Sequence, residues 1–112
     1  MLAHVNGVFT EYKPTKSAIG GIPREGEALT VFENHVVQIE EGDSIFFFSD
    51  GLPDQFGGPE NRKFMTKKIK DIVLASSEIP MPKVYANLKK DYYDWLGEGK
   101  QIDDVLFIGI KF

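Results

Sequence analysis

Two acidic positions next to strongly apolar segments are the residues most able to do chemistry in this sequence. Asp50 follows the apolar run 45–49 and precedes Gly51, and the pair Asp103-Asp104 precedes the apolar run 105–110. Each run has the aromatic and β-branched composition of a buried strand. If these strands are neighbours in one sheet, their acidic ends lie side by side, and a hard divalent cation with oxygen ligands stabilises such a pair. The pattern therefore favours a metal site.

Each acidic motif also has a simpler interpretation. Ser49-Asp50-Gly51 is typical of a turn, because aspartate favours turns and glycine readily supplies positive φ. An acidic pair before a strand commonly marks only its solvent-exposed end. The metal hypothesis therefore depends on the two motifs occurring together.

Composition limits the classes of function. The chain has 112 residues, which fits one domain with a real core, and it has no cysteine, which excludes disulfides and thiolate metal ligands. Its net charge of −4 makes nucleic acid an unexpected partner. No stretch is long enough to cross a membrane and no signal peptide is evident, so we expect a cytoplasmic protein. The basic group Lys63, Lys67, Lys68 and Lys70 is typical of a solvated helix face, with contact to an acidic partner as the alternative.

The first half of the sequence predicts strands. Residues 2–5 and 8–12 flank Asn6-Gly7, a strong signal for a two-residue β-hairpin turn. A loop rich in glycine and proline follows over residues 13–26. Residues 32–39 and 44–49, joined by a turn at 41–43, predict a second hairpin. Because residues 45–48 do not alternate with polar ones, the returning strand is expected to be central and covered on both faces.

The second half predicts two helices and a last strand. Apolar residues recur at helical spacing over 65–76, and again from Pro80 to Gly97. The final strand is expected from residue 104 or 105 to 112. The sequence therefore predicts an α+β fold in which two helices pack on one face of an antiparallel β-sheet. The loop 52–59 is interpreted either as a flap near a substrate entrance or as a plain connection from strand to helix.

Three segments in this order also carry a family resemblance. Residues 43–51 (DSIFFFSDG), 54–59 (DQFGGP) and 101–106 (QIDDVL) together resemble the C-terminal half of the bacterial metal-dependent serine/threonine phosphatases. The resemblance is to the type 2C branch represented by the stage II sporulation phosphatase and the stress-regulator phosphatases. Residues 2–13 are similar to an internal hairpin of that family, and Ile19-Gly20 is similar to a short signature before its later strands.

The resemblance implies a fold, a cofactor and a set of ligands. The fold is half of an α-β-β-α sandwich, and the cofactor is a pair of Mn²⁺ or Mg²⁺ ions. Asp50 and Asp103 match the family's metal ligands, whereas Asp104 and Gly51 match neighbouring positions of minor importance. The implied chemistry is attack of metal-activated water on phosphoserine or phosphothreonine. The implied substrate is a phosphoprotein such as an anti-sigma-factor antagonist, in bacterial stress or sensor signalling.

No segment resembles the earlier half of that family's domain, where a further Asp-Gly motif supplies a bridging ligand. We therefore expect residues 1–112 to form a single partial domain with a weak metal site, inactive on its own. Exposed apolar surface and an unpaired strand edge predict a homo-oligomer. The alternative is a non-catalytic interaction or dimerisation module that keeps the fold. His4 and His35 lack partners at ligand spacing and are expected to be surface or lining residues rather than ligands.

Overall fold

A computed structural model describes residues 1–15, 17, 30–75 and 78–112 of the chain. The Ile19-Gly20 signature and most of the glycine- and proline-rich loop lie outside the described residues. The strands are β1 (Leu2–Val5), β2 (Val8–Glu11), β3 (Ser44–Phe48), β4 (Phe56–Gly57), β5 (Arg62–Lys63) and β6 (Phe107–Lys111). The helices are α1 (Gly51–Asp54), α2 (Met65–Ala75) and α3 (Met81–Leu96).

Four of the strands form one antiparallel sheet in the order β2-β1-β3-β6. The first hairpin is confirmed: Asn6 and Gly7 both have positive φ, 49° and 76°, as a tight two-residue turn between twisted strands requires. β3 lies between β1 and β6, so the predicted central position of this strand is confirmed as well.

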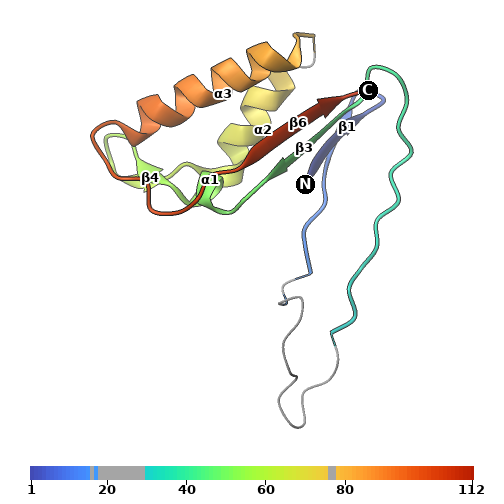
Figure 1. Ribbon diagram of the computed structural model, residues 1–112, viewed down its shortest axis with the longest axis horizontal. Coiled ribbons are helices and arrows are strands. Elements are labelled where there is room, and N and C mark those ends of the chain that lie inside the picture. Colours follow the sequence, from blue (N-terminus) through green and yellow to red (C-terminus); the bar gives the residue numbers. More distant parts are fainter. Residues whose placement is uncertain (16, 18–29, 76–77) are drawn as a thin grey trace.

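The two longer helices lie together on one side of this sheet (Figure 1). Both predicted helices are confirmed, and Gly97 follows α3 with a positive φ of 56°. The buried core joins the sheet to the helices, and among the described residues it contains Leu2, Phe46, Leu52, Phe64, Ile69, Val73, Val84, Leu88 and Tyr92. The predicted fold class, an antiparallel sheet with helices packed on it, therefore agrees with the structure.

The predicted strand over residues 32–39 is wrong. Residues 30–40 contain no strand, and Figure 1 shows them running away from the sheet. Both edges of β3 are already paired, with β1 and with β6, so no edge remains beside β3 for a second hairpin. Val31 and Val36 are 87 % and 84 % exposed, so these two apolar side chains lie mostly in solvent.

Full cover of β3 on both faces is also wrong for the described residues. Phe46 points into the helix-covered core and is 1 % exposed, whereas the next residue, Phe47, is 41 % exposed. Its cross-strand partner Ile108 is 43 % exposed, and Ile110, opposite Ile45, is 41 % exposed. The sheet therefore has an apolar face opposite the helices.

The segment between β3 and α2 has more structure than predicted. It contains the short helix α1 and the two-stranded sheet of β4 and β5. A Cβ on Gly57 would lie 2.0 Å from the backbone oxygen of Trp95, and the Gly58 amide donates a hydrogen bond of 2.7 Å to that oxygen. These contacts fix the segment to α3, as expected for a structured connection.

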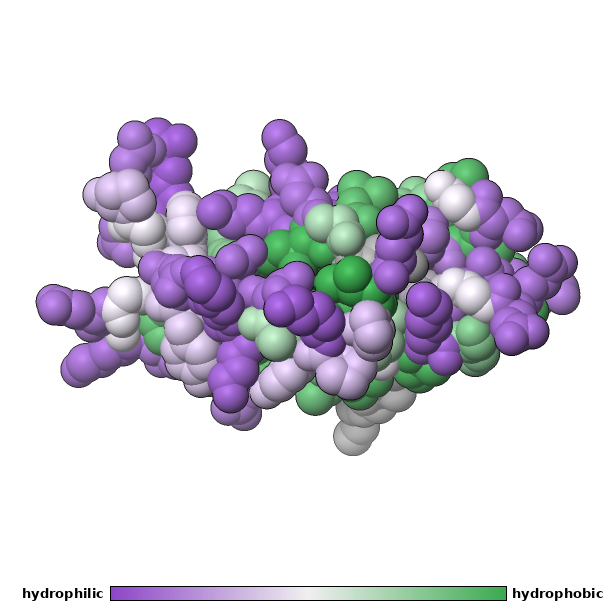
Figure 2. Space-filling view, turned by 90° about the horizontal axis from the view of Figure 1, so that it is seen from above, coloured by the Kyte–Doolittle hydropathy of each residue, from purple (hydrophilic) through white to green (hydrophobic). Residues whose placement is uncertain are grey.

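The outer surface of the helices is largely polar. Figure 2 views the molecule from the side on which α3 lies and shows mostly hydrophilic side chains, with hydrophobic residues between them. In the described part of the chain, no helix has the length and hydropathy needed to span a membrane.

Candidate functional site

The pairing of β3 with β6 brings the two acidic motifs to the same edge of the sheet. Phe48, the last residue of β3, lies opposite Phe107, the first residue of β6. Asp50 follows β3 by two residues and Asp103 precedes β6 by four, so both lie beyond this last pair of the ladder. The expectation that the two apolar strands are neighbours is confirmed.

Ser49 joins the two motifs beyond the ladder. Its backbone amide donates to the Leu106 carbonyl at 3.1 Å, and its hydroxyl accepts from the Leu106 amide at 2.9 Å. The same hydroxyl donates to the Asp104 carbonyl at 2.9 Å. Beyond Phe107, hydrogen bonds of the Ser49 side chain take the place of backbone hydrogen bonds between the two strands. This explains why β6 begins at Phe107 rather than at residue 104 or 105.

Gly51 packs directly against the second acidic motif. A Cβ at this position would lie 2.3 Å from the Asp104 carbonyl oxygen and 3.3 Å from the Asp103 Cβ. The φ of Gly51 is not positive, so the turn explanation does not account for the glycine. Instead, glycine is needed because any side chain would collide with the backbone at Asp103-Asp104. This close approach holds Asp50 and Asp103 on adjoining segments.

The carboxylate oxygens at this edge of the sheet are the type of ligand that a hard divalent cation prefers. Asp50, Asp103 and Asp104 are exposed, and carboxylate oxygens are ligands that Mg²⁺ and Mn²⁺ accept. One Asp103 oxygen, Oδ1, accepts a hydrogen bond from the Asp104 amide at 2.7 Å, which orients that carboxylate. In the described ranges, no group of three or more histidine, cysteine or acidic residues is arranged to hold a metal. Asp50 and Asp103 therefore fit part of a coordination shell.

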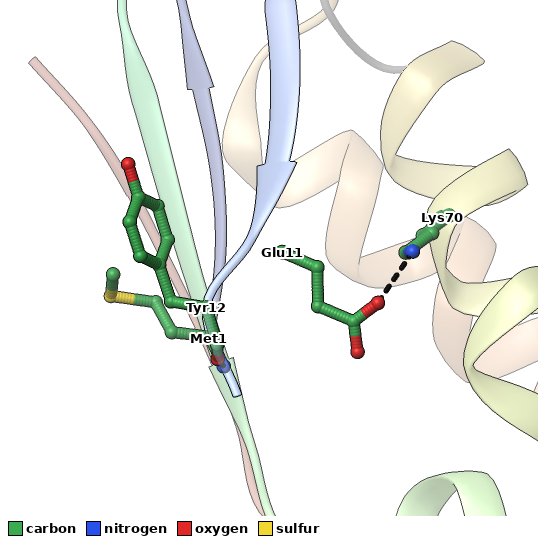
Figure 3. Close-up of polar contacts among 4 residues, drawn as sticks. All are labelled: Met1, Glu11, Tyr12 and Lys70. Carbon is green, nitrogen blue, oxygen red and sulfur yellow. Dashed lines mark hydrogen bonds and ion pairs between the residues drawn. The ribbon is translucent and has the colours of Figure 1, made fainter. Parts of the chain in front are cut away.

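A cavity of about 560 Å³ opens beside Asp50. Its lining consists of Met1, Glu11, Tyr12, Lys13, Pro14, Thr15, Glu33, Asn34, His35, Phe48, Asp50 and Pro53. Figure 3 shows part of this wall: Glu11 points from β2 toward Lys70 of α2, while Met1 and Tyr12 point the other way. The Glu11–Lys70 ion pair, 2.6 Å long, lowers the pKa of Glu11 through that hydrogen bond and ties the edge strand to the helix layer.

The two histidines take the lining and surface positions expected of them. His4 stacks on Phe9 with 4.2 Å between ring centroids, and His35 lies 5.1 Å from the Tyr12 ring at the cavity. No pattern in the sequence points to Ser49 as a bridge or to Gln55, whose buried amide contacts the loop before Asp103. A single polar residue has no periodicity, so only the folded contacts identify it.

Comparison with known proteins identifies a family and a similar solved structure. The family model described as Stage II sporulation protein E (SpoIIE) matches residues 1–112. A structure titled SiaA-PP2C domain of Pseudomonas aeruginosa matches with a TM-score of 0.80 at 23 % identity. That match covers 99 % of this chain and 42 % of the other, so the chain spans less than half of that structure. No curated protein matches in sequence.

Proposed function

This chain belongs to the Stage II sporulation protein E family, and we propose that it contributes a metal-binding part of a protein phosphatase acting on phosphoserine or phosphothreonine. The observation that carries the proposal is the contact of Gly51 with the backbone at Asp103-Asp104, which sets two carboxylate-bearing segments side by side. The fold shared with a PP2C domain supports the same assignment.

Asp50 and Asp103 are the residues that would hold a Mn²⁺ or Mg²⁺ ion. When bound, such ions lower the pKa of water and neutralise negative charge on a phosphate group. This chain's own contribution is to place the two carboxylates. Ser49 and Gly51 hold the segments together, and the Asp104 amide orients the Asp103 carboxylate. Asp104 is proposed to be a neighbour of the ligands rather than a ligand.

The proposed substrate is a phosphorylated protein in bacterial stress or sensor signalling, such as an anti-sigma-factor antagonist. Family membership supports this choice. The cavity beside Asp50 is open and is lined by Lys13 and His35 among acidic and apolar residues, which suits an extended peptide more than a small enclosed metabolite.

The test is phosphate release from phosphoserine and phosphothreonine peptides with Mn²⁺. It uses the longest natural polypeptide that contains residues 1–112, since the matched domain is more than twice as long. We expect Asp50→Asn and Asp103→Asn each to lower kcat/KM by at least about a hundredfold, because each removes a charged ligand. Residues 1–112 alone are expected to release little phosphate.

Asp54→Asn is the matched control. Asp54 lies in the same short segment and forms an exposed ion pair of 2.9 Å with Lys63, a contact that contributes little to stability. This variant should keep its activity. If Asp50→Asn were as active as Asp54→Asn, the role of Asp50 as a metal ligand would be refuted. If the wild-type polypeptide released no phosphate, the phosphatase proposal would be refuted, and a non-catalytic interaction module with this fold would be the better explanation.

A further inference from the structure

Gln55 is a buried side-chain amide whose donor and acceptor atoms are all engaged. The residue is 1 % exposed and lies directly after α1. Its Nε2 donates to the Phe56 carbonyl at 2.9 Å and to the Lys100 carbonyl at 3.0 Å. Its Oε1 accepts from the Tyr92 hydroxyl at 3.1 Å and from the Ile102 amide at 3.4 Å. An amide offers two donors and an acceptor with two lone pairs, so this side chain is fully used.

The partners of Gln55 lie in the loop that leads to Asp103. Lys100 and Ile102 are exposed residues of a segment without helix or strand, and Ile102 is 60 % exposed. Little apolar burial therefore holds this loop in place. Fixed hydrogen bonds from a buried group must supply the order that packing does not.

Gln55 is also linked to Asp50 through a short and rigid path. Asp50 is the N-cap of α1 and Gln55 is its C-cap, so one helical turn separates them. The Asp54 amide donates to the Asp50 carbonyl at 3.0 Å, which closes that turn. A displacement of Gln55 therefore alters the position of the Asp103 loop relative to Asp50.

Tyr92 holds the amide from the helix side. Its hydroxyl donates to Oε1 from the buried face of α3, and burial raises the pKa of Tyr92, so the hydroxyl keeps its proton at neutral pH. With Oε1 held by Tyr92, Nε2 is directed toward the Lys100 carbonyl. The hydrogen-bond network thus runs from α3 through Gln55 to the acidic loop.

We propose that Gln55 is a positioning residue that fixes the loop 100–104 against α1 and so sets the spacing of Asp50 and Asp103. The part of this inference that concerns a bound cation rests on the proposed function. The part that concerns the loop rests on the hydrogen bonds alone. Gln55 acts through the loop and does not touch the substrate.

The experiment compares Gln55→Met, which keeps the length of the side chain without its hydrogen bonds, with Tyr92→Phe, which removes one hydroxyl. The first readout is amide hydrogen exchange at Asp104 and Leu106, because neither amide bonds to Gln55. We expect Gln55→Met to speed exchange there by about tenfold or more, as the loss of a hydrogen bond implies. Tyr92→Phe should give a smaller change in the same direction.

Val84→Ala is the control for general destabilisation, since the Val84 side chain of α3 is fully buried in the core and, being a hydrocarbon, forms no hydrogen bond with this network. It should speed exchange throughout the core without preference for Asp104 and Leu106. If both amides exchange in Gln55→Met as they do in the wild type, Gln55 only fills space and the inference is overturned. If Gln55→Met does not fold, exchange at Asp104 and Leu106 is compared between Tyr92→Phe and the wild type instead, and unchanged exchange in Tyr92→Phe then overturns the inference.

The second readout is the Kd for Mn²⁺, the metal alone serving as the probe. We expect Gln55→Met to weaken binding by about 10-fold or more, the usual effect of removing a group that orients ligands, and Val84→Ala to leave it unchanged. An unchanged Kd in Gln55→Met would count against the positioning role. If the wild type binds no Mn²⁺, the proposed function fails, and the exchange data still decide the role of Gln55.

Discussion

Replacing Gly51 by alanine tests how tightly the two acidic segments pack. The added Cβ would lie 2.3 Å from the Asp104 carbonyl oxygen and 3.0 Å from the Asp104 carbonyl carbon. Non-bonded carbon and oxygen atoms settle roughly 1 Å farther apart than the shorter of these distances. Because the colliding atoms are backbone, no side-chain rotation relieves the contact, and the segments must separate.

The expected loss of stability in Gly51→Ala follows from the collision of the added methyl group with the backbone. Inserting a methyl group into a closely packed site costs about 1–3 kcal/mol, so Gly51→Ala should lower the Tm by roughly 10 °C in a chain of this size. Denaturant unfolding and thermal melting give the stability change. Mn²⁺ titration should show weaker binding as well, because the displaced backbone carries Asp103.

The control for this variant is Gly97→Ala. Gly97 has a φ of 56° and no atom within 4 Å of an added Cβ, so alanine there costs about 1–2 kcal/mol through backbone conformation alone. It should lose stability without losing Mn²⁺ affinity. The reasoning is refuted if Gly51→Ala is as stable as the wild type, or if it binds Mn²⁺ as well as Gly97→Ala does.

Two further predictions concern stability at low pH and self-association. The Asp43 carboxylate accepts hydrogen bonds from the Glu40 and Asn6 amides, which lower its pKa below the usual 3.8. The Asp43 carboxylate therefore stabilises the folded state fully at pH values above its ordinary pKa of 3.8, and this stabilisation is lost as the pH falls through the lower pKa of the folded state. The stability difference between wild type and Asp43→Asn, measured by denaturant unfolding, should be constant at neutral pH and shrink in acid; a difference that grew in acid would contradict this. We also propose that the apolar face containing Phe47 and Ile108 joins two copies of the chain. Burying a phenylalanine contributes about 1.5–3 kcal/mol, so Phe47→Lys should weaken the dimer at least about tenfold in sedimentation, and a monomeric wild type would refute the proposal.

Local sequence patterns were sufficient to predict the first hairpin and the two longer helices. Asn6-Gly7 predicts the first hairpin because both residues tolerate positive φ, and the apolar spacing predicts α2 and α3. The strand over 32–39 is wrong for a non-local reason. Its composition resembles that of a strand, but β1 and β6 already occupy the two edges of β3, and no local pattern reveals that competition.

In the candidate site, too, some features can be predicted from the sequence and others depend on contacts between distant residues. The position of the Asp50 and Asp103 segments at one edge of the sheet follows from the pairing of two apolar strands, so the sequence predicts it. The reason for Gly51 is a backbone contact with a residue more than fifty positions away, and a turn motif suggests the wrong cause. Gln55 is invisible to pattern analysis, because a lone amide in a glycine-rich segment acquires its role only from the loop folded onto it.

The most direct test of the shared cation site is paramagnetic broadening of amide NMR signals by Mn²⁺. A cation held by Asp50 and Asp103 should broaden the amides of residues 50–52 and 103–104 at low Mn²⁺ concentration, even when binding is weak. Asp50→Asn and Asp103→Asn should each abolish the effect at both segments, since one cation serves both. Broadening confined to one segment, or unchanged in either variant, would contradict the claim that these two carboxylates share a metal ion.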